Sequence, residues 1–190
     1  MKNRRNFIKQ MAIIGILTAL SFVFGMIKIP VSGTSVTLML PVVVIGAALC
    51  GPLVGAWLTV IPSLVTLLVG EAALFMAVSP VATVVTLFLK GILAGLAAGL
   101  VYKALSNKRP YGAVVLSAVV APVVNTGIFL LGCYLFLWDA IMSLATDAGV
   151  GVGAVLIGLA GINFVVELVL NVVLCPAILR IIRVASKKRV

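Results

Sequence analysis

Charged residues are scarce in this sequence of 190 residues, and histidine is absent. Only 9% of the residues are charged, against about 25% in soluble domains. Without histidine, a zinc site built from cysteine and histidine is excluded. The three cysteines, Cys50, Cys133 and Cys175, stand among apolar residues at no metal-like spacing, so we interpret them as buried thiols and expect no metal site.

Motifs for common catalytic and energy-coupling chemistry are also lacking. No G-x-x-x-x-G-K-[ST] phosphate loop is present, so we do not expect this chain to hydrolyse ATP. Paired carboxylates and a nucleophile elbow are missing as well. A proton relay of the usual kind lacks its parts, because only one acid lies deep in an apolar run. We therefore expect neither an enzyme nor a cofactor.

Apolar residues are abundant, at 64% of the chain, and the mean hydropathy is +1.36. A chain this short has no interior large enough to bury them, which excludes a soluble domain, and a disordered chain would be poor in these residues. Long apolar runs, without ten-residue alternation, indicate helices rather than a barrel. A span takes roughly 20 residues. The sequence therefore predicts an all-α integral membrane protein, a bundle of six transmembrane helices that forms one membrane domain, residues 1–190.

Loops and spans follow from the turn-forming residues. The first apolar run follows a basic leader and resembles a signal peptide, but it is too long and lacks a small-x-small cleavage site, so we interpret it as a permanent span. Segments 28–35 and 139–151 are predicted loops, and residues 70–80 form a connection with some helical character. The predicted spans are 7–27, 36–48, 53–69, 81–105, 113–138 and 152–182.

Basic residues gather on one side of this topology. Of the 14 lysines and arginines, all but Lys28 and Lys90 fall on the side that holds both termini. Glu71, Asp139 and Asp147 fall on the other side. The positive-inside rule then predicts a multi-pass protein of the cell membrane with both termini cytoplasmic. The net charge of +10 thus reflects topology and contact with membrane lipid, and we expect no nucleic acid partner.

Two charged residues lie inside predicted spans, Lys90 in the fourth and Glu167 in the sixth. Each costs several kcal/mol at the bilayer centre unless it faces protein or water. They lie roughly 14 and 22 Å below the outer ends of their spans, close enough in depth for the lysine to approach the carboxylate. One interpretation is a structural pair that sets helix register, and the other is a direct or water-mediated contact with a ligand.

Asparagines extend this polar seam. Asn163, Glu167 and Asn171 recur at a spacing of four and share one helix face, and Asn125 lies in the fifth span after Pro122. Interhelical hydrogen bonds of under about 1 kcal/mol explain such a seam without a ligand. Ligand contact is the alternative, which we favour for Asn125 and Asn163, whereas we favour a structural role for Asn171.

Small residues also recur at a spacing of four, which lets helix backbones approach closely. Gly15 and Ala19 do so in the first span, where a docking face for a partner and internal packing explain the pattern equally well. Gly91, Gly95 and Gly99 do so in the fourth span, where internal packing is the favoured explanation.

Several segments carry a family resemblance over nearly the whole chain. They are AIIGILTAL at 12–20 behind the basic leader, TLMLPVVVIGAALCGPLVGA at 37–56, LKGILAGLAAG at 89–99, APVVNTG at 121–127 and GINFVVE at 161–167. In this order they resemble the substrate-binding S components of energy-coupling factor (ECF) transporters, six-span vitamin-capture proteins with both termini cytoplasmic.

The resemblance implies a mechanism and partners. An S component binds its vitamin in an outward-facing pocket roofed by loops, then docks on a transmembrane scaffold subunit and two ATPase subunits that drive inward release. The implied docking residues are Ala12, Gly15 and Ala19, although the family more often shows alanine at both positions of the motif. The candidate substrate-binding residues are Lys90, Asn125, Asn163 and Glu167, with Thr34 and Thr37 in a hydroxyl-rich outer loop that is either an ordinary turn or a lid.

The resemblance also ranks the substrates. The hydroxyl-rich loop, Asn125-Thr126-Gly127 and an intramembrane lysine look most like the pantothenate branch. The riboflavin branch is similar in plan, but its usual acidic residues after the first loop are replaced here by Thr34-Ser-Val-Thr37. The alternative from another class is a small secondary transporter or facilitator. Such folds often show internal repeats, and the two halves of this sequence show none.

Overall fold

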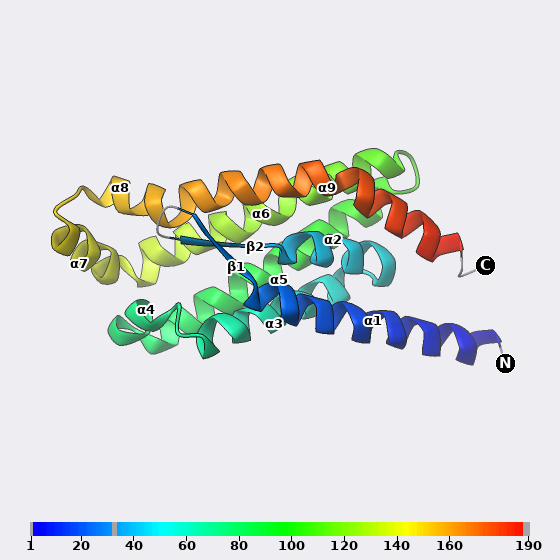
Figure 1. Ribbon diagram of the computed structural model, residues 1–190, viewed down its shortest axis with the longest axis horizontal. Helices are drawn as coiled ribbons and strands as arrows, with labels where there is room; N and C mark the ends of the chain where they lie inside the picture. Colours follow the sequence, from blue (N-terminus) through cyan, green and yellow to red (C-terminus); the bar gives the residue numbers. More distant parts are fainter. Residues whose placement is uncertain (1, 32–33, 188–190) are drawn as a thin grey trace.

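The computed structural model describes residues 2–31 and 34–187, and helices account for most of them. Figure 1 shows an elongated bundle of helices that run roughly along its long axis. The elements are α1 (Lys2–Met26), β1 (Lys28–Val31), β2 (Thr34–Thr37), α2 (Met39–Cys50), α3 (Pro52–Leu68), α4 (Ala73–Val78), α5 (Pro80–Leu105), α6 (Pro110–Phe136), α7 (Trp138–Ala148), α8 (Val152–Leu156), the π-helical turn η1 (Ile157–Gly161) and α9 (Ile162–Lys187).

Span-length helices form the frame of the bundle. Within the described ranges, four helices are long and apolar enough to cross a membrane: Phe7–Met26, Pro80–Leu105, Pro110–Phe136 and Val152–Ala185, the last of which combines α8, η1 and most of α9. The apolar helices α2 and α3 are shorter. The protein is therefore an apolar helical bundle of the membrane class. The count of six spans and the side on which the termini lie stay predictions.

Prolines begin three of these helices. Pro52, Pro80 and Pro110 stand in the first turns of α3, α5 and α6, where the missing N–H has no intrahelical partner to lose. Gly51 precedes Pro52 with φ of 101°, a backbone conformation that favours glycine, and it makes the sharp corner between α2 and α3. The turn residues of the sequence therefore mark these boundaries closely.

The two ends of the bundle differ in what they hold. Figure 1 places both termini and the turn between α5 and α6 at one end, and α4 and α7 at the other. We call these the terminal end and the α4–α7 end.

A β-hairpin replaces the predicted loop of residues 28–35. β1 and β2 pair antiparallel, with Lys28 opposite Thr37 and Val31 opposite Thr34. Pairing lets the backbone groups of two extended segments satisfy each other, which matters in a protein surrounded by lipid. The otherwise all-α architecture thus includes a short sheet, and the second predicted span starts later than expected, at Met39.

The segment 139–151, predicted to be a loop, is largely the helix α7. Asp139 stands in its first turn, where an acid interacts favourably with the helix dipole. Ala140, Ile141 and Ala145 are buried along one face, and Gly149 closes the helix in a left-handed conformation with φ of 64°. The loop prediction is wrong because these apolar residues recur at helical spacing and have an interior face to pack against, whereas the two acids lie in the first and last turns of the helix.

The apolar core fills the part of the bundle around α2. This helix is buried along almost its whole length and packs against α1, α3, α5, α6 and α9. With 12 residues it is roughly 18 Å long, so it fills only part of the length of the bundle. The hairpin precedes α2 in the chain. Next to Met39, the first residue of α2, the interior of the bundle holds a cavity.

Close backbone contact joins α3 to α5. A Cβ atom on Gly95 would collide with the backbone of Gly55, and one on Gly99 would collide with Pro52. A buried hydroxyl also joins α3 to α5, since Ser63 Oγ donates to the carbonyl oxygen of Leu87 (3.1 Å). Ser117 Oγ of α6 donates to the carbonyl oxygen of Ala98 in α5 (2.9 Å). The glycine spacing in α5 therefore serves internal packing, as predicted.

Candidate functional site

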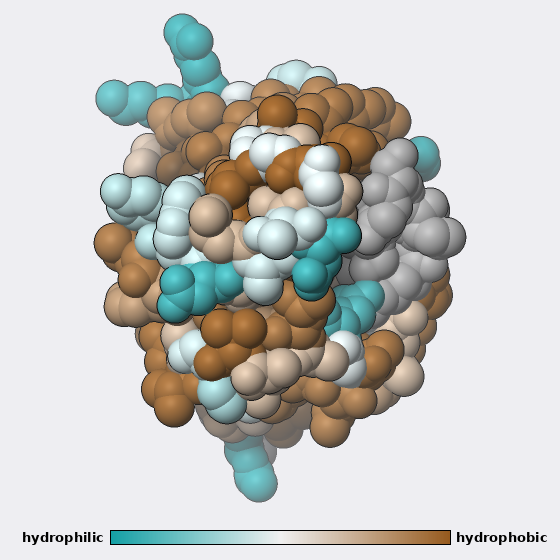
Figure 2. Space-filling model, turned by 90° about the vertical axis from the view of Figure 1, so that its left-hand side faces the viewer, coloured by the Kyte–Doolittle hydropathy of each residue, from teal (hydrophilic) through white to brown (hydrophobic). Residues whose placement is uncertain are grey.

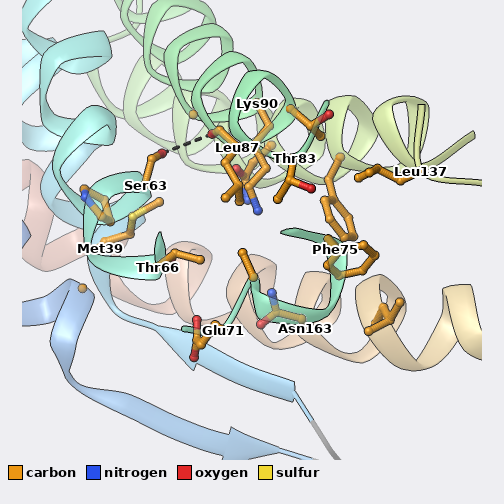
Figure 3. A pocket seen from close by; sticks show the side chains of 18 of the residues that line it. Met39, Ser63, Thr66, Glu71, Phe75, Thr83, Leu87, Lys90, Leu137 and Asn163 are labelled. Carbon is orange, nitrogen blue, oxygen red and sulfur yellow. Dashed lines mark hydrogen bonds between the residues drawn. The ribbon is translucent and has the colours of Figure 1, made fainter. Parts of the chain in front are cut away.

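A cavity of about 560 Å³ lies toward the α4–α7 end of the bundle. This volume falls in the range of small-molecule sites. Its walls come from α3, α4, α5, α6 and α9, and Met39 at the start of α2 lies at its inner side (Figure 3). Because exposed Glu71 and buried Glu167 line the same cavity, it leads from the surface into the interior.

Four of the six predicted substrate-binding residues line this cavity. Lys90 comes from α5, Asn125 from α6, and Asn163 and Glu167 from the first turns of α9. Glu167 is 5% exposed and Asn125 is 7% exposed. Asn163 and Glu167 stand about one helical turn apart on α9, and Lys90 of α5 lines the same cavity. The structure therefore brings residues from three helices together, and their contact with a substrate stays a prediction.

Several buried polar atoms in this cavity wall lack a hydrogen-bond partner. Within the described part of the chain, they are Thr86 Oγ1, Asn125 Oδ1, Asn163 Oδ1 and Glu167 Oε2. Most buried polar groups in proteins are paired, and an unpaired one costs about 1–3 kcal/mol. A cluster of oxygens on three helices around one cavity is the arrangement expected of a site that binds a polar molecule through its N–H and O–H groups.

Asn171 differs from these residues although it lies on the same helix as Glu167. Its side chain is 1% exposed and its Oδ1 also has no partner in the described structure, but it does not line the cavity. This position agrees with the structural role that we favour for Asn171.

Two aromatic rings form an apolar part of the wall, which the sequence did not indicate. Phe75 of α4 and Phe129 of α6 meet edge to face, with centroids 6.2 Å apart. Lys90 Nζ lies 4.8 Å from the centroid of the Phe129 ring, a cation–π contact. The phenylalanines are ordinary residues of apolar segments, so nothing in their spacing distinguishes them from lipid-facing ones.

The π-helical turn η1 precedes the site residues of α9. It covers Ile157–Gly161, ends immediately before Ile162, and contributes Leu159 to the cavity wall. A π-turn inserts an extra residue per turn and rotates the side chains that follow, and such turns occur often at functional sites. Here it sets the direction from which Asn163 and Glu167 approach the cavity.

The remaining predicted substrate residues, Thr34 and Thr37, belong to β2, and their side chains lie outside the described residues. Around the same end of the bundle, Figure 2 shows hydrophilic side chains in a band between apolar surfaces. The apolar surfaces are those expected to face lipid, and the polar band is where an aqueous solute can approach.

The three predicted docking residues lie on α1, away from the cavity. Ala12, Gly15 and Ala19 are all exposed, and a Cβ atom on Gly15 would meet nothing within 4 Å. The buried side of α1 is formed instead by Leu17, Ser21 and Gly25. Internal packing therefore does not explain the small residues at positions 15 and 19.

The fold and the cavity define a class: an apolar helical membrane protein with a small-molecule-sized polar site enclosed by its helices. A family model described as ECF transporter, substrate-specific component, matches residues 9–179. The chain belongs to this family, which confirms the resemblance drawn from its sequence. Comparisons with the curated proteins and with the solved structures match no protein.

Membership in this family bears on the function class, the location and the partners of the chain. The family is a substrate-binding component of transporters, not an enzyme family, and its members are multi-pass membrane proteins. Membership implies a small-molecule substrate together with ECF scaffold and ATPase partners. Membership favours a substrate-binding component of an ECF transporter over the alternative of a small secondary transporter.

Proposed function

We propose that this chain captures a water-soluble vitamin, with pantothenate the favoured substrate, and delivers it inward when docked on an ATP-driven ECF module. The observation that carries the proposal is the cavity that combines Lys90, Glu167 and the unpartnered amide oxygens of Asn125 and Asn163. Apolar helices around such a cavity keep its polar groups away from lipid, so a solute is the partner that satisfies them.

The orientation in the membrane is part of the proposal. Basic residues gather at the terminal end, including Lys103 and Arg109 near the turn between α5 and α6 and Arg180 and Arg183 near the end of α9. The positive-inside rule places this end in the cytoplasm. The cavity, at the α4–α7 end, then faces outward. Six crossings follow if α1, α2 with the hairpin, α3, α5, α6 and α8–α9 each span the membrane.

The chemistry of pantothenate matches the lining. Its carboxylate suits the ammonium group of Lys90, and its hydroxyl and amide N–H groups supply donors for the oxygens of Asn125, Asn163 and Thr86. Riboflavin is the second candidate, favoured by one observation: the Phe75–Phe129 pair offers an aromatic wall to a flat ring.

Native mass spectrometry of the detergent-purified protein tests the proposal. We expect a co-purified mass equal to pantothenate, because S components bind tightly enough for a ligand to survive purification. Thermal-shift titrations with pantothenate, riboflavin and a panel of other vitamins then rank the substrates. A riboflavin mass would correct the substrate alone, whereas an empty spectrum with no response to any vitamin would contradict vitamin capture.

Substitutions at Lys90 and Glu167 separate the two roles of this pair. We expect Lys90→Met to lower stability by about 3 kcal/mol, because it removes the cation that lines the same cavity as the buried carboxyl group of Glu167. The double variant Lys90→Met/Glu167→Gln should regain most of this stability, since it removes both charges. Its affinity for pantothenate should nevertheless stay roughly 10- to 100-fold below that of the unmodified protein, because the carboxylate of the substrate has lost its cation.

Thermal unfolding and pantothenate titration of the unmodified protein and the two variants measure these effects. Normal affinity in the double variant would show that the pair is structural only and would remove Lys90 from the substrate site.

A further inference from the structure

Two threonines of α5, Thr83 and Thr86, stand about one helical turn apart in the cavity wall, and their hydroxyl groups differ. Both side chains are buried, at 2% and 3% exposed. A threonine inside a helix commonly donates its hydroxyl hydrogen to the carbonyl oxygen three or four residues earlier. Thr83 does so, with Oγ1 at 2.8 Å from the carbonyl oxygen of Ser79. Thr86 Oγ1 has no partner among the described residues, so this hydroxyl is available to a bound molecule.

Gly132 of α6 packs directly against Thr86. A Cβ atom at position 132 would collide with both branches of the threonine, Oγ1 and Cγ2, and would come within 3.1 Å of its Cβ atom. Because both branches and the Cβ atom are involved, rotation of the threonine side chain relieves only part of this collision. Position 132 therefore has to be glycine for Thr86 to occupy its place in the cavity wall.

The contacts between α5 and α6 place Thr86 apart from Asn125. Gly132 lies beside Thr86. Lys90, one turn further along α5, lies over the ring of Phe129, so the two helices run antiparallel. Asn125 stands seven residues from Gly132 along α6, which is roughly 10 Å along the helix axis. The polar groups of this wall are therefore spread along the bundle, with Thr86 nearer to the α4–α7 end.

We propose that Thr86 forms a separate subsite of the cavity, positioned by Gly132, which hydrogen-bonds one end of an elongated substrate whose other end reaches Asn125. This inference rests on the proposed capture of a water-soluble vitamin. A hydroxyl group both donates and accepts, so the subsite takes an oxygen or an N–H group of the substrate. Pantothenate has hydroxyl groups toward one end and a carboxylate at the other, whereas a compact molecule would reach only one of the two residues.

The variant Thr86→Val tests the subsite, because valine keeps the shape of the side chain but removes the hydroxyl. We expect the purified full-length variant to bind pantothenate about tenfold more weakly. Without ligand the same variant should melt about 2–4 °C higher, because an unpaired buried hydroxyl is gone. A threonine with a purely structural role would not combine weaker binding with higher stability.

Three further variants are the controls. Thr83→Val should leave the affinity for pantothenate within about twofold, because the hydroxyl of Thr83 is already paired with the backbone. Thr86→Ser retains the hydroxyl and should keep the affinity within about threefold. Gly132→Ala displaces Thr86 and should weaken binding about as much as Thr86→Val does.

Isothermal titration with pantothenate and with riboflavin measures the affinities, and thermal unfolding of the ligand-free proteins measures the stabilities. A vitamin that binds the unmodified protein and Thr86→Val equally well would overturn the Thr86 subsite and leave vitamin capture intact. Equal weakening by the two valine variants would also overturn it, since the loss would come from a general disturbance of α5. Normal affinity in Gly132→Ala would overturn the positioning role of Gly132. Absence of binding to the unmodified protein would contradict the proposed function and, with it, this inference.

Discussion

Asn125→Leu should lower the affinity for pantothenate by at least about tenfold while the protein stays folded. Leucine matches asparagine closely in size but offers no hydrogen-bonding group. In the structure Asn125 Oδ1 is buried, lines the cavity and has no partner among the described residues, so a donor of the substrate is the partner that we expect for it. Isothermal titration of the purified variant with pantothenate measures the loss.

Asn171→Leu is the matched control for this experiment. Asn171 is also buried, at 1% exposed, and its Oδ1 is likewise without a described partner, but it lies outside the cavity wall. Its replacement should leave the affinity for pantothenate within about twofold, because only the environment between the helices changes. If Asn125→Leu binds pantothenate as tightly as the unmodified protein, Asn125 does not contact the substrate. If both variants weaken binding equally, the loss does not come from a contact specific to the cavity.

Gly15→Leu should reduce vitamin uptake by cells to the level of cells that lack the chain, while substrate binding by the purified protein is unchanged. The position is exposed on α1 with open space around it, so leucine disturbs no contact within the fold. A large side chain there would, however, keep a partner helix from approaching the backbone at Gly15 and Ala19. Uptake of labelled pantothenate in cells that contain the complete ECF module is the readout.

Two other glycines supply the controls. Gly153 in α8 also has open space around it but lies outside α1 and outside the cavity wall, so Gly153→Leu should preserve both uptake and binding. Gly95 faces the backbone of Gly55, so Gly95→Leu should fail to fold or lose about 3 kcal/mol or more of stability. Normal uptake by Gly15→Leu would show that α1 does not dock through this face.

Features of the fold that depend on local chemistry could be predicted from the sequence. Pro52, Pro80 and Pro110 start helices near the predicted boundaries because a proline lacks the N–H that an interior position needs. The predictions that were wrong concern segments whose secondary structure depends on tertiary contacts. The hairpin forms because β1 and β2 find each other as partners, and α7 forms because it has an apolar face to bury.

The polar residues of the candidate site could also be predicted from the sequence. A lysine, a glutamate and asparagines within apolar runs are costly in lipid, so their inward position follows from composition and depth alone. That reasoning selected Lys90, Asn125, Asn163 and Glu167, which the structure places around one cavity. The assignment of Thr34 and Thr37 to the substrate site stays a prediction, because their side chains lie outside the described residues.

By itself, then, the sequence determined the membrane class, most helix boundaries and the identity of the inward polar residues. Only the tertiary structure decided which apolar residues line the cavity, such as Phe75 and Phe129, and which backbone Gly95 meets. The physical reason is that lipid and protein interior are both apolar. An apolar side chain of a membrane helix is about equally stable facing lipid or facing the protein interior, so the apolar pattern does not indicate which face of the helix is buried. A polar side chain is stable only where it faces protein or water.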